Sequence, residues 1–288
     1  MKYLYGAYCC APNDSAPILH RLSAAMKQQT AGGSAGIPES LRMNILIKIL
    51  RVLAIPQYRA AALRTRVAAS TEHDRILQGL GLDTVVDIGA NRGQFALCIR
   101  RLYPPAQIFS FEPLSNPARV YMRNFGTDPR AQFFQKAIAP MAGSSAMHVS
   151  RWDVSSSLLP FAQAQHDNFP FTEESGQETV STSPLSECLD AASIAGCALL
   201  KIDVQGFELH ALEGCGELLA RFRYVYVEAS FVELYVGQAL ATDVLKYLLN
   251  RGFKLICVAN LSYGRSERPI QADFLFCRSE PPVITECA

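Results

Sequence analysis

Residues 85–93 read Val-Val-Asp-Ile-Gly-Ala-Asn-Arg-Gly, and this stretch decides the fold. It begins inside an apolar strand candidate, Thr84–Ile88, whose one acidic residue is Asp87. The strand runs directly into a turn at Gly89, where glycine adopts backbone angles that other residues avoid, and Gly93 then opens a helix. A strand, a glycine turn and a helix in succession are typical of doubly wound α/β sheets, whose ligands bind at the carboxyl ends of the strands.

The same alternation continues through the chain from about residue 76. Further strands are predicted at residues 107–111, 131–136, 146–150, 198–202, 224–227, 253–258 and 273–277. Helices are predicted at residues 94–102, 116–124, 208–220 and 241–250. Strands that alternate with helices in this way predict an α/β fold with a doubly wound, mostly parallel sheet.

Two regions fall outside this alternation. Residues 1–75 are predicted to form an N-terminal helical extension, and residues 76–288 a single ligand-binding domain. Within that domain, residues 152–188 are rich in Ser, Gln, Glu and Pro and lack a periodic pattern. A long irregular insertion in a compact domain is often functional, so this segment is predicted to be an irregular substrate loop.

The extension contains a candidate for a basic amphipathic helix, for which Pro38 and Ser40 are suitable start signals. Its apolar residues are Leu41, Ile45, Ile47, Leu50, Leu53 and Ile55, and its basic residues are Arg42, Lys48, Arg51, Arg59, Arg64 and Arg66, opposed by Glu39. We favour a helix that packs its apolar side on the main domain. The alternative is a peripheral contact with an anionic membrane or with a partner.

The composition excludes several classes of protein. The 288 residues are 49% hydrophobic and 18% charged, which excludes general disorder. The net charge is +1, whereas a protein that coats nucleic acid would carry a large basic excess. No apolar run approaches the roughly 20 residues needed to cross a bilayer. The nine cysteines are odd in number and form no CxxC pair, so we expect free thiols, a cytoplasmic location and no zinc site.

The glycine turn also limits the ligand. A dinucleotide-binding turn would read GxGxxG, but the middle position here is Asn91. Asp87 would repel a pyrophosphate and is better matched to an ammonium group. Glu112 ends the next strand, 25 residues after Asp87, where a carboxylate can accept both hydroxyl protons of a ribose. An amino-acid end and a ribose occur together in S-adenosylmethionine, which is the cofactor that we predict.

Two later strands also end in acidic residues. Asp203 follows a short apolar run, and Gly206 then opens a helix; Glu228 ends the strand after that helix. Because the ends of parallel strands meet at one edge of a sheet, Asp203 is expected to face the same cleft as Asp87. An N-cap is the alternative role for Asp203, and a structural role stays open for Glu228.

These motifs resemble the FkbM-type S-adenosylmethionine-dependent methyltransferases. The resemblance covers roughly residues 76–278 and is carried by VVDIGANRGQFAL, FSFEP, AIAPMAGSS, LLKIDVQGFELHALEGC, VYVEASFVELYVGQ and QADFLFCR. It implies a Class I methyltransferase (Rossmann-like) fold with a seven-stranded, mostly parallel sheet. It also implies methyl transfer to a hydroxyl oxygen of a sugar, glycolipid or secondary metabolite.

The resemblance further implies roles for individual residues. The residues expected around the cofactor are Asp87, Gly89, Asn91 and Gly93 at its methionine end, Glu112 at its ribose, and Lys136 and Ala137 at its adenine. Asp203 is expected near the transferring methyl group. One departure from the family pattern is Ser186, which stands where members usually have an aspartate.

An alcohol is a poor nucleophile until a nearby group takes its proton. We expect Asp203 to be this base, assisted by Glu228, with His166 as an alternative. A divalent metal held by Asp203 and Glu228 would be another way to acidify the hydroxyl, although the sequence does not require one. Two other functions stay open: a nicotinamide-dependent oxidoreductase, and a non-catalytic cofactor-binding scaffold that recruits a partner through its N-terminal helix.

Overall fold

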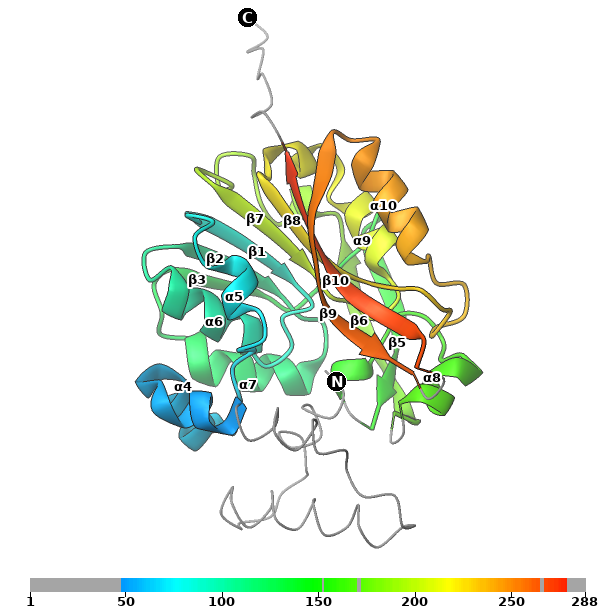
Figure 1. Ribbon diagram of the computed structural model, residues 1–288, viewed down its shortest axis with the longest axis horizontal. Helices are drawn as coiled ribbons and strands as arrows, with labels where there is room; N and C mark the ends of the chain where they lie inside the picture. The colour runs from blue at the N-terminus through cyan, green and yellow to red at the C-terminus, as the bar shows by residue number, and fades with distance from the viewer. Residues whose placement is uncertain (1–47, 152, 170–171, 265–266, 279–288) are drawn as a thin grey trace, which may run out of the picture.

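The computed structural model describes residues 48–151, 153–169, 172–264 and 267–278 (Figure 1). Its centre is a seven-stranded sheet in the order β3 (Ala131–Phe134), β2 (Gln107–Phe111), β1 (Thr84–Ile88), β7 (Ala198–Ile202), β8 (Tyr224–Ser230), β10 (Pro269–Arg278) and β9 (Phe253–Tyr263). The strand β10 runs antiparallel to both of its neighbours, and the other paired strands are parallel. The predicted α/β fold of the Class I methyltransferase type is confirmed.

The strand β1 positions the site, because it lies between β2 and β7 at the centre of the sheet. Both neighbours run parallel to it, so that Asp87 lies beside Ser110 of β2 and Lys201 of β7. All five residues of β1 are buried, which explains its apolar sequence. The carboxyl ends of β1, β2 and β7 therefore meet at one edge of the sheet, as the sequence predicts.

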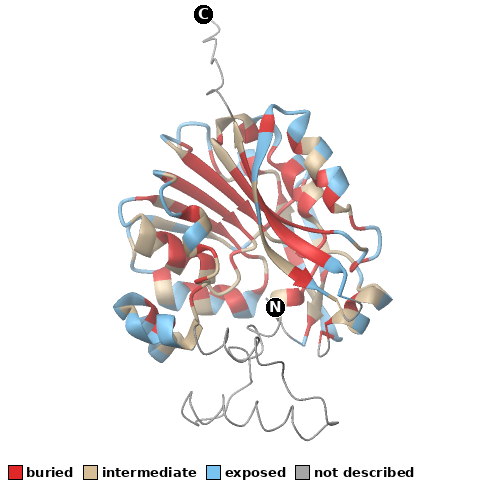
Figure 2. Cartoon of the chain, in the orientation of Figure 1, coloured by how far each residue is buried: buried red, intermediate tan, exposed pale blue. Residues whose placement is uncertain are grey.

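One face of the sheet is covered by α5 (Asp74–Leu77), α6 (Gln94–Leu102) and α7 (Ser115–Phe125) (Figures 1 and 2). Their apolar side chains form one core cluster together with Val85 and Leu199 of the sheet. Both arginines in the last turn of α6 lie at its carboxyl end, where positive charge is favourable.

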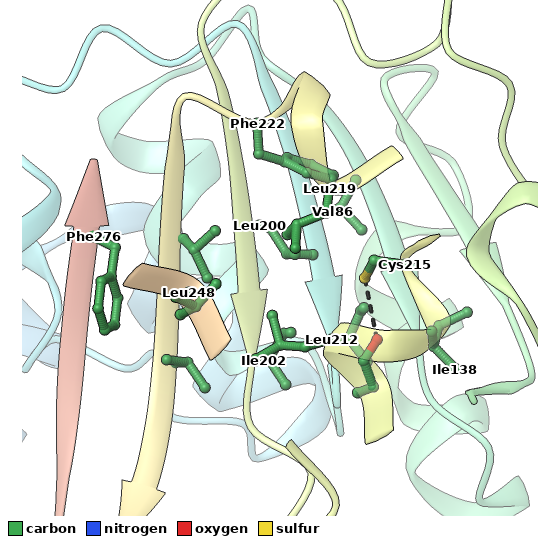
Figure 3. Close-up of a cluster of buried hydrophobic side chains, with 14 of the residues drawn as sticks. Val86, Ile138, Leu200, Ile202, Leu212, Cys215, Leu219, Phe222, Leu248 and Phe276 are labelled. Atoms are coloured by element: carbon green, nitrogen blue, oxygen red, sulfur yellow. Dashed lines mark hydrogen bonds between the residues drawn. The ribbon is translucent and has the colours of Figure 1, made fainter. Parts of the chain in front are cut away.

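The opposite face is covered by α9 (Glu208–Gly214) and α10 (Ala241–Leu249), which pack over a larger cluster of apolar side chains. Figure 3 shows Leu200 and Ile202 of β7 in this cluster, with Leu212 of α9 close to them. Successive strand residues point to opposite faces, so Leu199 and Leu200 belong to different clusters. The sheet is therefore buried on both faces, as expected for parallel strands.

Most of the predicted elements are confirmed, and β1, β2, β7 and α6 have the predicted bounds. The helix predicted at residues 208–220 is divided instead: α9 ends at Gly214, and a 3-10 helix follows at Gly216–Arg221. Gly216 has a φ of 52°, which is a left-handed angle that an α-helix does not contain. This single backbone conformation interrupts the predicted helix.

Residues 152–188 were predicted to be irregular, and this part of the prediction is wrong. They contain α8 (Gln163–Asn168) and the strand β6 (Glu174–Ser183), which lies between β4 (Ala137–Ile138) and β5 (Gly143–Ser150) in a second sheet. Most residues of β6 are exposed or half-buried. A strand held mainly by backbone hydrogen bonds has no alternating apolar pattern, and for this reason the sequence does not reveal it.

The predicted N-terminal extension is described only from residue 48, so the predicted start of its helix lies outside the described residues. Residues 48–54 are helical, and α4 (Pro56–Thr65) follows. Within the described residues, no helix has the length and apolar character that would be needed to span a membrane.

The apolar side chains of this region are divided between the core and the surface. Val52 and Tyr58 are buried in a small cluster with Ala69, whereas Leu50 and Leu53 are 57% and 44% exposed. The expectation that the apolar side packs on the main domain is therefore met only in part.

The variant Leu200→Ala tests how far the sheet depends on the core of Figure 3. Leu200 is fully buried, so its truncation removes apolar contacts and leaves a cavity. We expect the free energy of unfolding, measured by urea denaturation, to fall by about 2–5 kcal/mol. Leu249→Ala changes an exposed leucine of α10 and should alter the same quantity by less than about 0.5 kcal/mol. Equal effects at the two positions would contradict this description of the core.

Candidate active site

A cavity lies at the carboxyl edge of the sheet, where the turn after β1, the segment after β2 and the turn after β7 meet. The predicted site residues that line it are Gly89, Asn91, Glu112, Lys136, Ala137 and Asp203. Asp87, Gly93 and Glu228 are predicted site residues that do not line it. Residues 68–73 and 153–158 complete much of its wall, so the cavity also depends on segments that lack a recognisable motif.

Glu112 is held firmly at the cavity wall. Its Oε1 accepts a hydrogen bond from the backbone N–H of Leu114 at 2.8 Å, and its Oε2 accepts one from Asn91 at 3.0 Å. The residue is only 4% exposed. Burial raises the pKa of Glu112 to about 8, because the two backbone bonds offset only part of the desolvation cost. The glycine turn and Glu112 thus form one rigid unit with a carboxyl group beside the cavity.

Asp87 is placed differently from the prediction. Its carboxylate is fully buried, and Oδ1 lies 3.0 Å from Nζ of Lys201. Lys201 Nζ also donates a hydrogen bond to the carbonyl oxygen of Gly89 at 2.9 Å and lies over the ring of Phe95. Burial raises the pKa of Asp87, and the Lys201 ammonium opposes this rise. Asp87 was predicted to contact a ligand amino group, but it does not line the cavity and its carboxylate faces Lys201 instead.

The two glycines of the turn have different structural tasks. Gly89 has a φ of 82°, and a Cβ at this position would lie 1.9 Å from the carbonyl oxygen of Asp203. Glycine is therefore required where the turns after β1 and β7 touch. Gly93 has a φ of 89°, and a Cβ there would lie 2.9 Å from the ring of Phe125. Gly93 serves the packing of α6 on α7, which corrects its predicted place beside the ligand.

Asp203 and Glu228 are connected through the side chain of Gln205. Gln205 Nε2 donates to Asp203 Oδ1 at 2.6 Å and to Glu228 Oε2 at 3.0 Å. Gln271 Nε2 donates to the other oxygen of Glu228 at 2.7 Å. Glu228, which was predicted to assist Asp203, is buried outside the cavity wall and reaches Asp203 only through Gln205. Among the described residues, no group of three or more His, Cys, Asp or Glu side chains is arranged to hold a metal ion.

Gln205 has a backbone conformation that is unfavourable for a residue with a side chain. Its φ is 55°, in the left-handed region. Surrounding hydrogen bonds fix it: Tyr235 OH donates to Gln205 Oε1 at 3.1 Å, and Ser157 Oγ donates to the Gln205 carbonyl at 2.6 Å. Unfavourable backbone conformations that are held by several surrounding contacts occur most often at functional sites in proteins.

The turn after β7 is capped by Glu208 and not by Asp203. Glu208 Oε1 accepts hydrogen bonds from the backbone N–H groups of Val204 at 3.2 Å and Gly206 at 3.0 Å. Burial raises the pKa of Glu208 to about 7. The N-cap of α9 is Phe207, so the alternative role proposed for Asp203 is not found. Asp203 lines the cavity.

A buried histidine that the sequence does not single out also lines the cavity. Nδ1 of His73 lies 2.9 Å from Tyr226 OH, which donates to Asp273 Oδ2 at 2.9 Å. Asn260 Nδ2 donates to the same oxygen at 2.7 Å. His73 precedes β1 and reaches the cavity only through tertiary packing, so no local pattern could indicate it. His166, the alternative base, packs against Phe161 and is not a lining residue.

The sequence matches the family model of the methyltransferase FkbM domain over residues 87–255. The chain belongs to this FkbM methyltransferase family. It is similar to the 2-O-methyltransferase NoeI of Sinorhizobium fredii, with 31% identity over 171 residues that cover 57% of this chain and 70% of that protein. Among solved structures it is similar to precorrin-6y C5,15-methyltransferase from Geobacter metallireducens, with 12% identity, a TM-score of 0.40, and coverage of 78% of this chain and 90% of that chain. It is also similar to the fibrillarin/Nop5p complex, with 12% identity, a TM-score of 0.39, and coverage of 75% and 82%.

Lys201 is the residue of this FkbM domain that the sequence could have revealed. It interrupts the run Leu-Leu-Lys-Ile of a strand that is otherwise apolar, and a lysine in a buried strand needs a partner. Asp87 of the neighbouring strand β1 is that partner, because it is paired in register with Lys201. Two of the motifs that carry the FkbM resemblance are therefore joined by one buried ion pair.

The variant Glu112→Gln tests the raised pKa of Glu112 in the FkbM domain. Between about pH 4.5 and pH 8 the folded chain keeps a proton on Glu112 that the unfolded chain has released, so this group makes stability fall as the pH rises through that range. We expect the melting temperature of Glu112→Gln to decline less than that of the wild type from pH 5 to pH 8.5. If the melting temperatures of the two proteins change with pH in the same way, Glu112 does not have a raised pKa. Glu208→Gln is a control, whose own effect should be complete nearer pH 7.

Proposed function

We propose that this FkbM chain is an S-adenosylmethionine-dependent O-methyltransferase that acts on a hydroxyl group of a sugar, glycolipid or secondary metabolite. The observation that carries the proposal is the shared cavity of Glu112 and Asp203, which come from the ends of β2 and β7 and lie beside the glycine turn. One carboxyl group is then available to a ribose and the other to an acceptor hydroxyl. The 2-O-methyltransferase name of the relative NoeI supports oxygen as the accepting atom.

The chemistry of the cavity wall fits this cofactor. Glu112 presents a buried carboxyl group that can accept hydrogen bonds from ribose hydroxyls. Lys136 and Ala137 line the cavity together with the apolar residues Phe111 and Ile138, which suit the faces of an adenine ring. When bound, adenosylmethionine supplies an electrophilic methyl group, and the protein supplies binding and orientation.

Asp203 is the proposed general base. Its Oδ1 accepts the Gln205 amide hydrogen bond, which fixes the direction of the carboxylate within the cavity. A hydroxyl held within about 2.6–3.2 Å of that carboxylate could pass its proton to Asp203 as the new O–C bond forms. Glu228 supports this role by accepting a second hydrogen bond from the same amide group.

Polar residues in the cavity wall support a polar acceptor. Ser70, Glu72 and Gln94 line it together with His73. Hydroxyl and carboxyl groups of this kind hydrogen-bond to hydroxyl-rich molecules such as sugars. The observations favour a methyltransferase over a nicotinamide-dependent oxidoreductase, because Asn91 stands at the position of the middle glycine of a dinucleotide turn.

A pair of variants separates cofactor binding from catalysis. Asp203→Asn should lower turnover about 100- to 10,000-fold, as expected for the loss of a general base, and should leave the affinity for adenosylmethionine nearly unchanged. Glu112→Ala should instead weaken adenosylmethionine binding about 10- to 100-fold, because it leaves the ribose hydroxyls without their acceptors in a buried site. Affinity is measured by isothermal titration and turnover by transfer of labelled methyl groups. Wild-type affinity in Glu112→Ala would overturn the cofactor site, and full turnover in Asp203→Asn would favour the scaffold alternative.

The variant Gln205→Gly tests whether the Gln205 amide positions Asp203. Glycine accepts the positive φ of this residue, so the turn can keep its backbone while the amide is lost. We expect kcat to fall about 10- to 100-fold through misorientation of Asp203, with the affinity for adenosylmethionine retained.

Gln205→Glu is the matched control for the Gln205 experiment. It keeps the length of the side chain and adds a negative charge between Asp203 and Glu228, so the pH at which activity rises should move upward. Wild-type kcat in Gln205→Gly together with an unchanged pH profile in Gln205→Glu would show that the amide has no positioning role.

A further inference from the structure

We propose that the surface formed by residues 48–66 and α7, here called the arginine face, binds peripherally to an anionic lipid membrane. In Figure 1, α4 and α7 lie together at the lower left of the molecule. The two elements are in contact, because Arg64 Nη2 donates to the carbonyl oxygen of Asn124 at 3.2 Å and Thr65 Oγ1 donates to its side chain at 2.9 Å. The arginine face is therefore one continuous surface.

The charge of the arginine face is strongly one-sided. Its exposed arginines are Arg51, Arg59, Arg64, Arg66, Arg119 and Arg123. Residues 48–66 and 115–125 contain no Asp or Glu, so these two segments carry seven positive charges and the rest of the chain has a net charge of −6. Such a separation of charge points to an anionic partner, even though the net charge of the whole chain is close to zero.

Three acidic residues near this surface have ion-pair partners within the described residues. Glu72 forms an ion pair with Lys48, and Asp74 forms one with Arg101 of α6. Asp128, which follows α7, forms one with Arg100. Each of these carboxylates therefore pairs with a side chain other than the six exposed arginines.

Exposed apolar side chains within the arginine face favour a lipid surface over other anionic partners. Leu50, Leu53, Leu63 and Met122 are 57%, 44%, 69% and 48% exposed. Apolar groups among basic ones gain free energy at the boundary between lipid headgroups and acyl chains. A nucleic acid would bind the arginines through its phosphates but would leave these apolar side chains in contact with water. No described helix is long and apolar enough to span a membrane, so the expected contact is peripheral.

The arginine face adjoins the cavity. Lys48 begins the described part of this face, and it also lines the cavity together with Ala68 and Ser70. A chain docked by the arginine face would hold this end of the cavity at the lipid surface. Where the proposed methyltransferase function holds, such a placement suits an acceptor hydroxyl that is carried on a lipid headgroup.

Co-sedimentation with vesicles tests the docking without any catalytic assay. The full chain is mixed with phosphatidylcholine vesicles that contain or lack phosphatidylglycerol. We expect binding to the anionic vesicles only, weakening as the salt concentration rises. The triple variant R59Q/R119Q/R123Q should lower the partition coefficient about 100-fold, at about fivefold for each arginine.

Three controls make the test specific. R59K/R119K/R123K keeps the charge and should bind as the wild type does. L63S should weaken binding at unchanged charge. L249S/R251Q removes an exposed leucine at the end of α10 and an exposed arginine that follows it, on the opposite face of the sheet, and should have no effect.

Several outcomes would overturn the proposal. These are equal binding to both kinds of vesicle, wild-type binding by R59Q/R119Q/R123Q, and binding to a DNA duplex without binding to vesicles. The affinity of each variant for adenosylmethionine is measured in parallel. A chain that binds vesicles but not adenosylmethionine would overturn the proposed function and support the membrane contact. A chain that binds adenosylmethionine but not vesicles would overturn the membrane contact and leave the proposed function in place.

Discussion

The buried ammonium group of Lys201 is the interaction on which the geometry of the cavity depends. It lies on the central strand β7, forms an ion pair with Asp87 of β1 and holds the carbonyl oxygen of Gly89. An unpaired charge in this position would be very costly, because Lys201 and Asp87 are both nearly inaccessible to water. The pair therefore fixes the glycine turn against β7. This contact in turn requires Gly89 to lack a side chain, since the turn touches the backbone of Asp203.

The sheet could be predicted well from the sequence, because its central strands are buried on both faces. The runs at Thr84–Ile88 and Ala198–Ile202 are short, apolar and bounded by glycine turns, and the structure has them with the same bounds. The strand β6 could not be predicted in this way. It gains its stability from pairing with β5 and β4, and most of its side chains face water, so its sequence looks like that of a loop.

The candidate site was predictable to the extent that it is built from strand ends. Glu112 and Asp203 line the cavity because parallel strands bring their carboxyl ends to one edge. The sequence could not distinguish a carboxylate that faces the ligand from one that faces a neighbouring strand, and Asp87 and Glu228 are of the second kind. His73 comes from a segment without a motif, and its place depends on long-range packing against Tyr226.

The contrast between Asp87 and Glu112 indicates which of the two is suited to bind a ligand. Asp87 has a cation beside it, whereas the hydrogen bonds of Glu112 come from two backbone N–H groups that offset only part of its desolvation. A carboxyl group whose desolvation is only partly offset can still gain from further hydrogen-bond donors. In the proposed function, ribose hydroxyls would be those donors. Glu112 lines the cavity whereas Asp87 is fully buried against Lys201, so the carboxyl group on the cavity wall is the better receptor for a sugar.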